Sequence, residues 1–86
     1  MVKKPSWWAW ELEFTPHLLK RMIDRGFTEV DVRRMIEDAN AVLPTPEPGR
    51  WIVETNLERR KWFVVVEPDE VARTLVVITA YHPEAP

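Results

Sequence analysis

The sequence predicts a single α+β domain, in which two short helices are followed by a curled antiparallel sheet of about four strands. Two helix-start signals lie close together near residues 15 and 28, and the chain beyond residue 50 is rich in β-branched and aromatic residues. Prolines and a glycine separate the two regions. A chain of 86 residues has room for one core only. We therefore expect one domain over residues 10–83, a flexible N-terminal tail at 1–9 and a C-terminal tail at 84–86.

The predicted domain begins with an edge strand and a first helix. Residues 10–14 alternate apolar and acidic side chains, which is the period of a strand with one buried face. Thr15 then suits an N-cap, Pro16 suits the first turn, and Gly26 suits the left-handed position after a helix. The spacing between them predicts a helix that ends at Arg25, and its buried stripe consists of Leu18, Leu19, Met22 and Ile23.

A second helix and the remaining strands follow. The helix begins after Thr28, with Asp31 as the acid of a capping box, and its buried positions are Val32, Met35, Ile36 and Ala39. Strands are predicted at 50–54, 61–66 and 74–81, with turns at 55–60 and 67–73 and a brief further strand at 42–43 as a candidate. The order β-α-α-β-β-β, with short connections, predicts an antiparallel meander on which both helices pack.

Composition excludes several classes of function. The chain has no cysteine, so disulfide frameworks, zinc knuckles and thiol catalysis are excluded, and its two histidines lack the paired spacing of a metal site. We therefore expect no metal and no cofactor. No segment approaches the ~20 apolar residues of a membrane span, so we expect no membrane partner and a cytoplasmic location. The formal net charge of −2 argues against a general nucleic-acid coat, and any RNA site must be local.

The first predicted helix carries a basic ridge. His17, Arg21 and Arg25 are spaced four residues apart, so they project from roughly one face of the helix beside the apolar stripe. The alternative interpretation is a solvated helix face whose charge is balanced by neighbouring acids such as Asp24.

Two further groups of polar residues lie at predicted strand ends. Arg59 and Lys61 share one side of a strand start, and charges there also serve to block edge-to-edge aggregation. At the end of the last strand, Tyr81 points to one face and His82 to the other. Such strand ends are common functional sites and equally common points for a chain to leave the core.

The residues 14-FTPH-17, 21-RM-22, 25-RGFT-28 and Val32 reproduce the pattern F-T-x-H-x-x-x-R-M-x-x-R-G-[IF]-[ST]-x-x-x-V. This pattern resembles a small bacterial and phage domain family related to the BrnT and RelE toxins, and segments 62–66 and 76–81 are similar to that family's closing strands. The resemblance covers residues 10–83. It implies two helices on a curled antiparallel sheet and a metal-independent endoribonuclease of the toxin type.

The implied reaction is attack by a ribose 2′-hydroxyl on the adjacent phosphate, which requires no metal. It needs a general base, a general acid and cations that stabilise the charge on the phosphoryl oxygens. His17 is the first candidate for base or acid, and Tyr81 or His82 for the remaining proton transfer. The candidates for phosphate binding are Arg21, Arg25, Arg59 and Lys61.

The alternative function is a non-catalytic interaction module of the same fold. Such a module would bind an antitoxin-like protein, or it would form a homodimer through the tryptophan-rich N-terminus around Trp7 and Trp8. RNA is the partner that the nuclease hypothesis requires.

Overall fold

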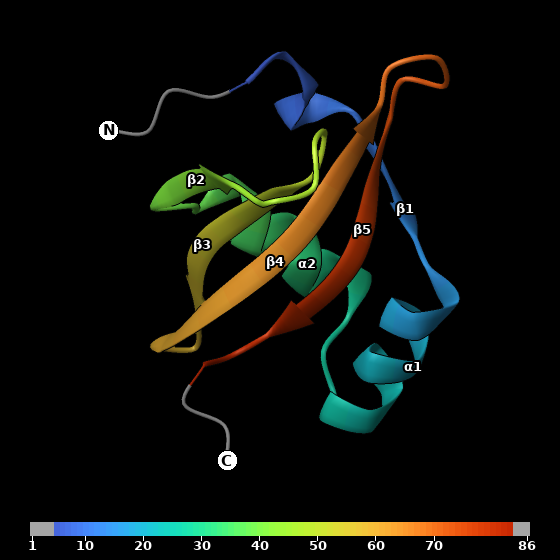
Figure 1. Cartoon of the computed structure of the whole chain (residues 1–86). Coiled ribbons are helices and arrows are strands. Elements are labelled where there is room, and N and C mark those ends of the chain that lie inside the picture. Colours follow the sequence, from blue (N-terminus) through green and yellow to red (C-terminus); the bar gives the residue numbers. More distant parts are fainter. Residues whose placement is uncertain (1–4, 84–86) are drawn as a thin grey trace.

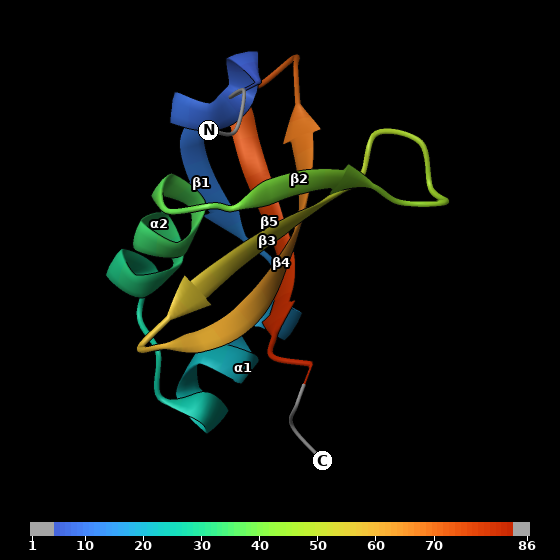
Figure 2. The same ribbon diagram turned by 90° about the vertical axis from the view of Figure 1, so that its left-hand side faces the viewer.

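The computed structural model describes residues 5–83, so the predicted tail residues 1–4 and 84–86 lie outside it (Figure 1). The elements are the 3-10 helix η1 (Ser6–Ala9), strand β1 (Glu11–Phe14), helices α1 (Pro16–Arg25) and α2 (Glu29–Glu37), and strands β2 (Ala41–Pro44), β3 (Trp51–Leu57), β4 (Arg60–Asp69) and β5 (Thr74–Tyr81). Both α-helices lie on the same face of the sheet (Figure 2). The α+β class predicted from the sequence is confirmed.

The sheet has five strands in the order β1-β5-β4-β3-β2, and its pairing is mixed. Strands β2 to β5 form the expected antiparallel meander, whereas β1 pairs in parallel with β5, from Glu11 opposite Thr74 to Phe14 opposite Val77. The predicted sheet of about four antiparallel strands was wrong in strand count and in the pairing of β1. Short connections predict the pairing of strands that follow one another in the sequence. They do not predict that the first strand pairs with the last.

A β-bulge interrupts β5 at Ile78. Its neighbours Val77 and Thr79 pair with consecutive residues of β4, so Ile78 has no partner on that strand. The carbonyl oxygen of Ile78 instead accepts a 2.9 Å hydrogen bond from the hydroxyl of Thr15. The bulge is therefore tied directly to the start of α1.

The bulge determines which way the end of β5 faces. Strict alternation would place Ala80 on the opposite face from Val77, yet both are buried, at 1% and 0% exposure. After the extra residue, Ala80 and His82 face the helices, while Tyr81 faces away and packs on Phe63. This shift in phase is what brings His82 to the helix-covered side.

Both α-helices begin where the sequence predicts, and α1 also ends there. The Thr15 hydroxyl accepts a 3.1 Å hydrogen bond from the Leu18 N–H, and Gly26 adopts the left-handed conformation with φ of 74°. Thr28 and Asp31 form the reciprocal capping box, with hydrogen bonds of 2.9 and 3.2 Å. Among residues 5–83, none of the helices combines the length and apolar character needed to cross a bilayer.

The two helices differ in how much of the predicted stripe they bury. In α1, Leu18 and Met22 are buried, but Leu19 is 43% exposed and Ile23 is 82% exposed, which corrects the predicted four-residue stripe. The reason is that α1 packs mainly on β5, so only a narrow side is covered, whereas α2 lies against β3 and β4. The α2 prediction is confirmed for its three fully buried residues, Val32, Met35 and Ile36. It was wrong for Ala39, which follows the end of α2 at Glu37 and is only half-buried.

The segment before β1 is folded onto the core. Residues 6–9, which the sequence pattern placed in a flexible tail, form η1 and bury Trp7 and Trp8 at 6% and 8% exposure. The Arg33 guanidinium holds this segment by donating hydrogen bonds to the carbonyl oxygens of Trp8 and Trp10, at 3.3 and 2.7 Å. Burial of these two large aromatic side chains stabilises the packed segment relative to an unpacked tail.

The β3–β4 hairpin is longer than predicted. Thr55, placed by its polarity in a turn, is fully buried, and its hydroxyl donates a hydrogen bond to the Met35 carbonyl oxygen of α2. The pairing continues to Leu57 opposite Arg60, which leaves a turn of only Glu58 and Arg59. A buried hydrogen bond has therefore extended the ladder past the point where polarity suggested that it ends.

Candidate functional site

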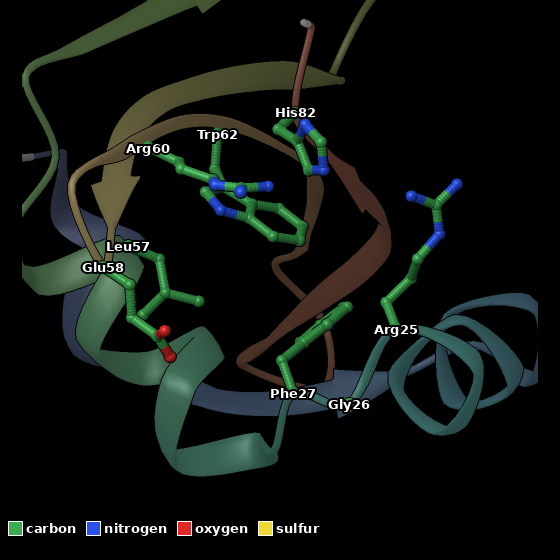
Figure 3. Close-up of a pocket in the computed structure, with 8 residues that line it drawn as sticks. All are labelled: Arg25, Gly26, Phe27, Leu57, Glu58, Arg60, Trp62 and His82. Atoms are coloured by element: carbon green, nitrogen blue, oxygen red, sulfur yellow. The ribbon is translucent and has the colours of Figure 1, made fainter. Parts of the chain in front are cut away.

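A pocket of about 380 Å³ opens where the end of α1, the β3–β4 hairpin and the end of β5 meet (Figure 3). We call it the His82 pocket. It is lined by eight residues from these three parts of the chain: Arg25, Gly26, Phe27, Leu57, Glu58, Arg60, Trp62 and His82. Segments far apart in the sequence thus contribute to one site.

The floor of the His82 pocket is aromatic and belongs to the core. Trp62 and Phe27 are 8% and 5% exposed, and their ring centroids lie 5.2 Å apart at an interplanar angle of 66°. The His82 ring also packs edge to face on Trp62, with 5.2 Å between the ring centroids and an interplanar angle of 68°. The left-handed conformation of Gly26 turns the chain after α1 so that Phe27 can enter this contact.

The His82 ring is held by packing on Trp62, and one of its nitrogen atoms is buried. Its Nδ1 atom is buried and has no hydrogen-bond partner among the groups of residues 5–83. Because this nitrogen has no surface open to the pocket, a ligand there could contact only the other ring nitrogen of His82, Nε2. An imidazole is also the side chain best suited to proton transfer near neutral pH.

Glu58 reaches the wall of the pocket from a turn with unusual backbone geometry. Both residues of the turn have positive φ, 50° at Glu58 and 68° at Arg59. Turns of this kind favour Asn-Gly, because other L-residues cost roughly 1–2 kcal/mol each in the left-handed region. Backbone strain of this size is concentrated at functional sites, and here it presents a carboxylate to the pocket.

The charged groups of the pocket come from separate elements. Arg25 lies at the end of α1, Arg60 at the start of β4, and Glu58 in the turn before it, and Figure 3 shows Arg25 and Glu58 on different sides of the hollow. The two guanidinium groups outnumber the single carboxylate, so the pocket is cationic before any charge on His82 is counted. This set of groups suits an anionic ligand with exchangeable protons.

The basic ridge predicted on α1 is present and meets the His82 pocket at Arg25. A neighbouring hollow of about 330 Å³ is lined by His17, Lys20, Arg21, Asp24 and Arg25. Arg25 lines both hollows, so a cationic strip runs from the pocket back along the helix. His17 is exposed at the far end of this strip, roughly 12 Å from Arg25 along the helix axis.

The structure divides the other predicted residues between two faces. His82 and Arg25 line the pocket, whereas Tyr81 packs on Phe63 on the opposite face of the sheet. Lys61 is on that opposite face too, where its ammonium lies 3.6 Å from a carboxylate oxygen of Glu54. Arg59 is exposed in the hairpin turn and is not among the pocket-lining residues.

Several pocket residues were not singled out from the sequence. Arg60 directly precedes Lys61, so the alternation of side chains along a strand puts the two on opposite faces, and this is the signal that could have indicated Arg60. Phe27 and Trp62 look like ordinary core residues. Glu58 gave no signal, because its position depends on a two-residue turn that the sequence did not reveal. Residues 5–83 contain no group of three or more His, Cys, Asp or Glu arranged to hold a metal.

Fold and site together define a small α+β domain with a cationic, aromatic-floored pocket at the end of its sheet. Residues 14–82 match the family described as "Domain of unknown function (DUF4258)", and the chain belongs to this family. No curated protein and no solved structure matches the chain. Nothing in these comparisons links the chain to the BrnT or RelE toxins.

Proposed function

We propose that this protein is a metal-independent endoribonuclease of the toxin type, with the His82 pocket as its active site. One observation carries the proposal: a single pocket brings an imidazole, a carboxylate and two guanidinium groups together above buried aromatic rings. Cleavage of RNA through its 2′-hydroxyl requires these kinds of group, namely a base, an acid and cations.

In the proposed reaction the ribose 2′-oxygen attacks the adjacent phosphorus. A P–O2′ bond forms and the P–O5′ bond breaks, which leaves a 2′,3′-cyclic phosphate and a free 5′-hydroxyl. Glu58 accepts the proton of the 2′-hydroxyl, because an ionised carboxylate is an acceptor only. Protonated His82 donates a proton to the leaving 5′-oxygen. Arg25 and Arg60 stabilise the negative charge on the phosphoryl oxygens.

The ridge on α1 supplies binding in this scheme. Lys20 and Arg21 extend the positive charge of Arg25 along the helix. An RNA strand that leaves the pocket would place its next phosphates beside these two side chains. His17, the first candidate for base or acid from the sequence, does not line the His82 pocket, so this scheme gives it a place in RNA binding instead of a proton transfer. A local strip of this kind reconciles RNA binding with a chain whose net charge is −2.

The test is cleavage of mixed single-stranded RNA by the purified full chain in the presence of EDTA. We expect products that end in a 2′,3′-cyclic phosphate. His82→Ala and Glu58→Gln should each lower the cleavage rate by about 100-fold or more. Lys61→Ala, on the opposite face, is the control and should leave the rate unchanged. The proposal fails if the wild-type protein leaves RNA intact, or if both variants cleave as fast as the wild type.

One structural feature favours the alternative, a non-catalytic interaction module. The face of the sheet away from the helices carries half-buried apolar side chains, among them Ile52, Phe63, Val65 and Val76. A homodimer or an antitoxin-like partner would cover such a surface. Absence of cleavage, together with a dimer in solution, would support this function. The buried positions of Trp7 and Trp8 leave little of those side chains for a partner to contact.

A further inference from the structure

β1 is an edge strand with one side open. The Thr15 N–H, directly after β1, donates to the Val77 carbonyl oxygen of β5 at 3.3 Å. Backbone groups alternate in direction along a strand, so the N–H and C=O groups of Leu12 and Phe14 point away from β5. In the part of the chain that the structure describes, β1 has no second neighbouring strand. This edge can therefore pair with a further strand.

At the start of this edge, a side chain of the protein itself pairs with an outward-pointing backbone group. The Trp10 carbonyl, which by the same alternation points outward, accepts a 2.7 Å hydrogen bond from the Arg33 guanidinium of α2. Between residues 5 and 83 no comparable hydrogen bond reaches the outward groups of Leu12 or Phe14. Arg33 thus marks where intramolecular pairing ends and where the unpaired edge begins.

A groove runs beside the unpaired edge. It has a volume of about 380 Å³ and lies between β1 and α2, with Glu11, Leu12, Phe14, Glu29, Val30 and Arg33 as its walls. Val30 is 65% exposed there, so its apolar side chain is open to contact. A strand added at the edge would have an apolar wall available for its side chains.

The charge around the groove indicates the charge of the segment that would bind there. Glu11, Glu13 and Glu29 are exposed, and none of them forms an ion pair within residues 5–83. Among the described residues, Arg33 is engaged with the two tryptophan carbonyls, and the Arg73 guanidinium lies over the Trp10 ring, 5.8 Å from its centroid. Pairing of β1 with a second copy of itself would bring the glutamates of both copies onto one face, which is repulsive. A basic segment would instead be attracted.

We propose that the edge of β1 and the flank of α2 form a docking groove for an extended basic segment of a partner protein, which adds a sixth strand to the sheet. The backbone groups of Leu12 and Phe14 pair with the segment, Val30 contacts its apolar side chains, and the three glutamates attract its lysines or arginines. This interaction is independent of the nuclease proposal.

The probe is an acetylated, amidated peptide of alternating lysine and valine, titrated into the full-length protein. Binding is followed by calorimetry and by the backbone amide resonances of β1. We expect the amides of Leu12 and Phe14 to shift and to become protected from hydrogen exchange. Val30→Lys should weaken binding at least tenfold, whereas Ile23→Lys, at a still more exposed position on α1, should have no effect.

Four results would overturn the proposal. These are no binding at millimolar peptide, equal binding of a glutamate–valine peptide, unchanged affinity in Val30→Lys, and unchanged amides in β1 when the peptide binds. A dimer of the protein that disappears in Val30→Lys would show that the occupant is a second copy, and this result also contradicts the proposal. None of these readouts depends on RNA cleavage.

Discussion

Trp62 and His82 pack edge to face, with ring centroids 5.2 Å apart and an angle of 68° between the planes. Trp62 is also a core residue at 8% exposure and contacts Phe27, which lies in the connection between α1 and α2. The histidine that follows the last strand is therefore seated against the core instead of projecting into solvent. In this protein the candidate site and the hydrophobic core share the same side chains.

The hairpin turn provides a test that separates stability from activity. Arg59 has φ of 68° and does not line the His82 pocket. Arg59→Gly should raise the free energy of unfolding by roughly 0.5–1 kcal/mol, because glycine adopts this conformation without steric cost. RNA cleavage should be retained. Chemical denaturation and the cleavage assay measure the two effects.

A change at the neighbouring residue, Glu58, should instead lower RNA cleavage. Glu58→Asn suits φ of 50° at least as well as glutamate, so stability should be equal or higher. The carboxylate on the pocket wall is lost, however, and cleavage should fall by about 100-fold. Full activity in Glu58→Asn would remove Glu58 from the mechanism.

Thr15 and Thr28 cap the two helices, but only Thr15 also holds the sheet. Its hydroxyl accepts from Leu18 and donates to Ile78, whereas the Thr28 hydroxyl makes the capping contact with Asp31. Thr28→Ala should cost about 1 kcal/mol and Thr15→Ala about 2–3 kcal/mol in the free energy of unfolding. Equal losses in urea denaturation would show that the bond to Ile78 contributes little.

Trp8 should be essential for stability although it precedes the first strand. Trp8→Ala removes a side chain that is 8% exposed, and we expect a loss of about 3–5 kcal/mol. A domain of this size has only ~5–15 kcal/mol in total, so the melting temperature should fall sharply. Ile23→Ala, on a side chain 82% exposed, is the control and should change stability by less than ~0.5 kcal/mol.

The salt dependence of RNA binding distinguishes the basic strip on α1 from the opposite face. With a 2′-O-methylated strand that resists cleavage, Arg21→Ala should reduce the slope of log K against log salt by about 0.7. Lys61→Ala should leave the slope unchanged, because Lys61 is paired with Glu54 across the sheet from the pocket. A reduced slope in Lys61→Ala alone would place RNA on the outer face.

Local signals in the sequence predicted the helices well. The caps at Thr15 and Thr28 and the end at Gly26 depend on side-chain and backbone preferences within a few residues, and the structure confirms each of them. The hydrophobic pattern also located the strands of the meander. Exposure of Leu19 and Ile23 could not be predicted, because it depends on how much of α1 the sheet covers.

Non-local features decided the rest of the fold and the site. The parallel pairing of β1 with β5 joins the two ends of the chain, and the bulge at Ile78 changes which face His82 occupies. Neither leaves a signature in neighbouring residues. The position of Glu58 depends in turn on the burial of Thr55 against α2, which extends the hairpin. The pocket is thus a product of long-range packing, and the sequence indicated only its histidine and one arginine.

The most direct test of the central claim is an NMR titration of the full chain with a short single-stranded 2′-deoxy oligonucleotide, which cannot undergo cleavage through a 2′-hydroxyl. The resonances to follow are the Trp62 indole N–H and the His82 imidazole. We predict that both shift together and saturate at the same oligonucleotide concentration, along with the side chain of Arg25. Unchanged Trp62 and His82 resonances at saturation, or no binding at all, would contradict the assignment of the His82 pocket as a nucleic-acid site.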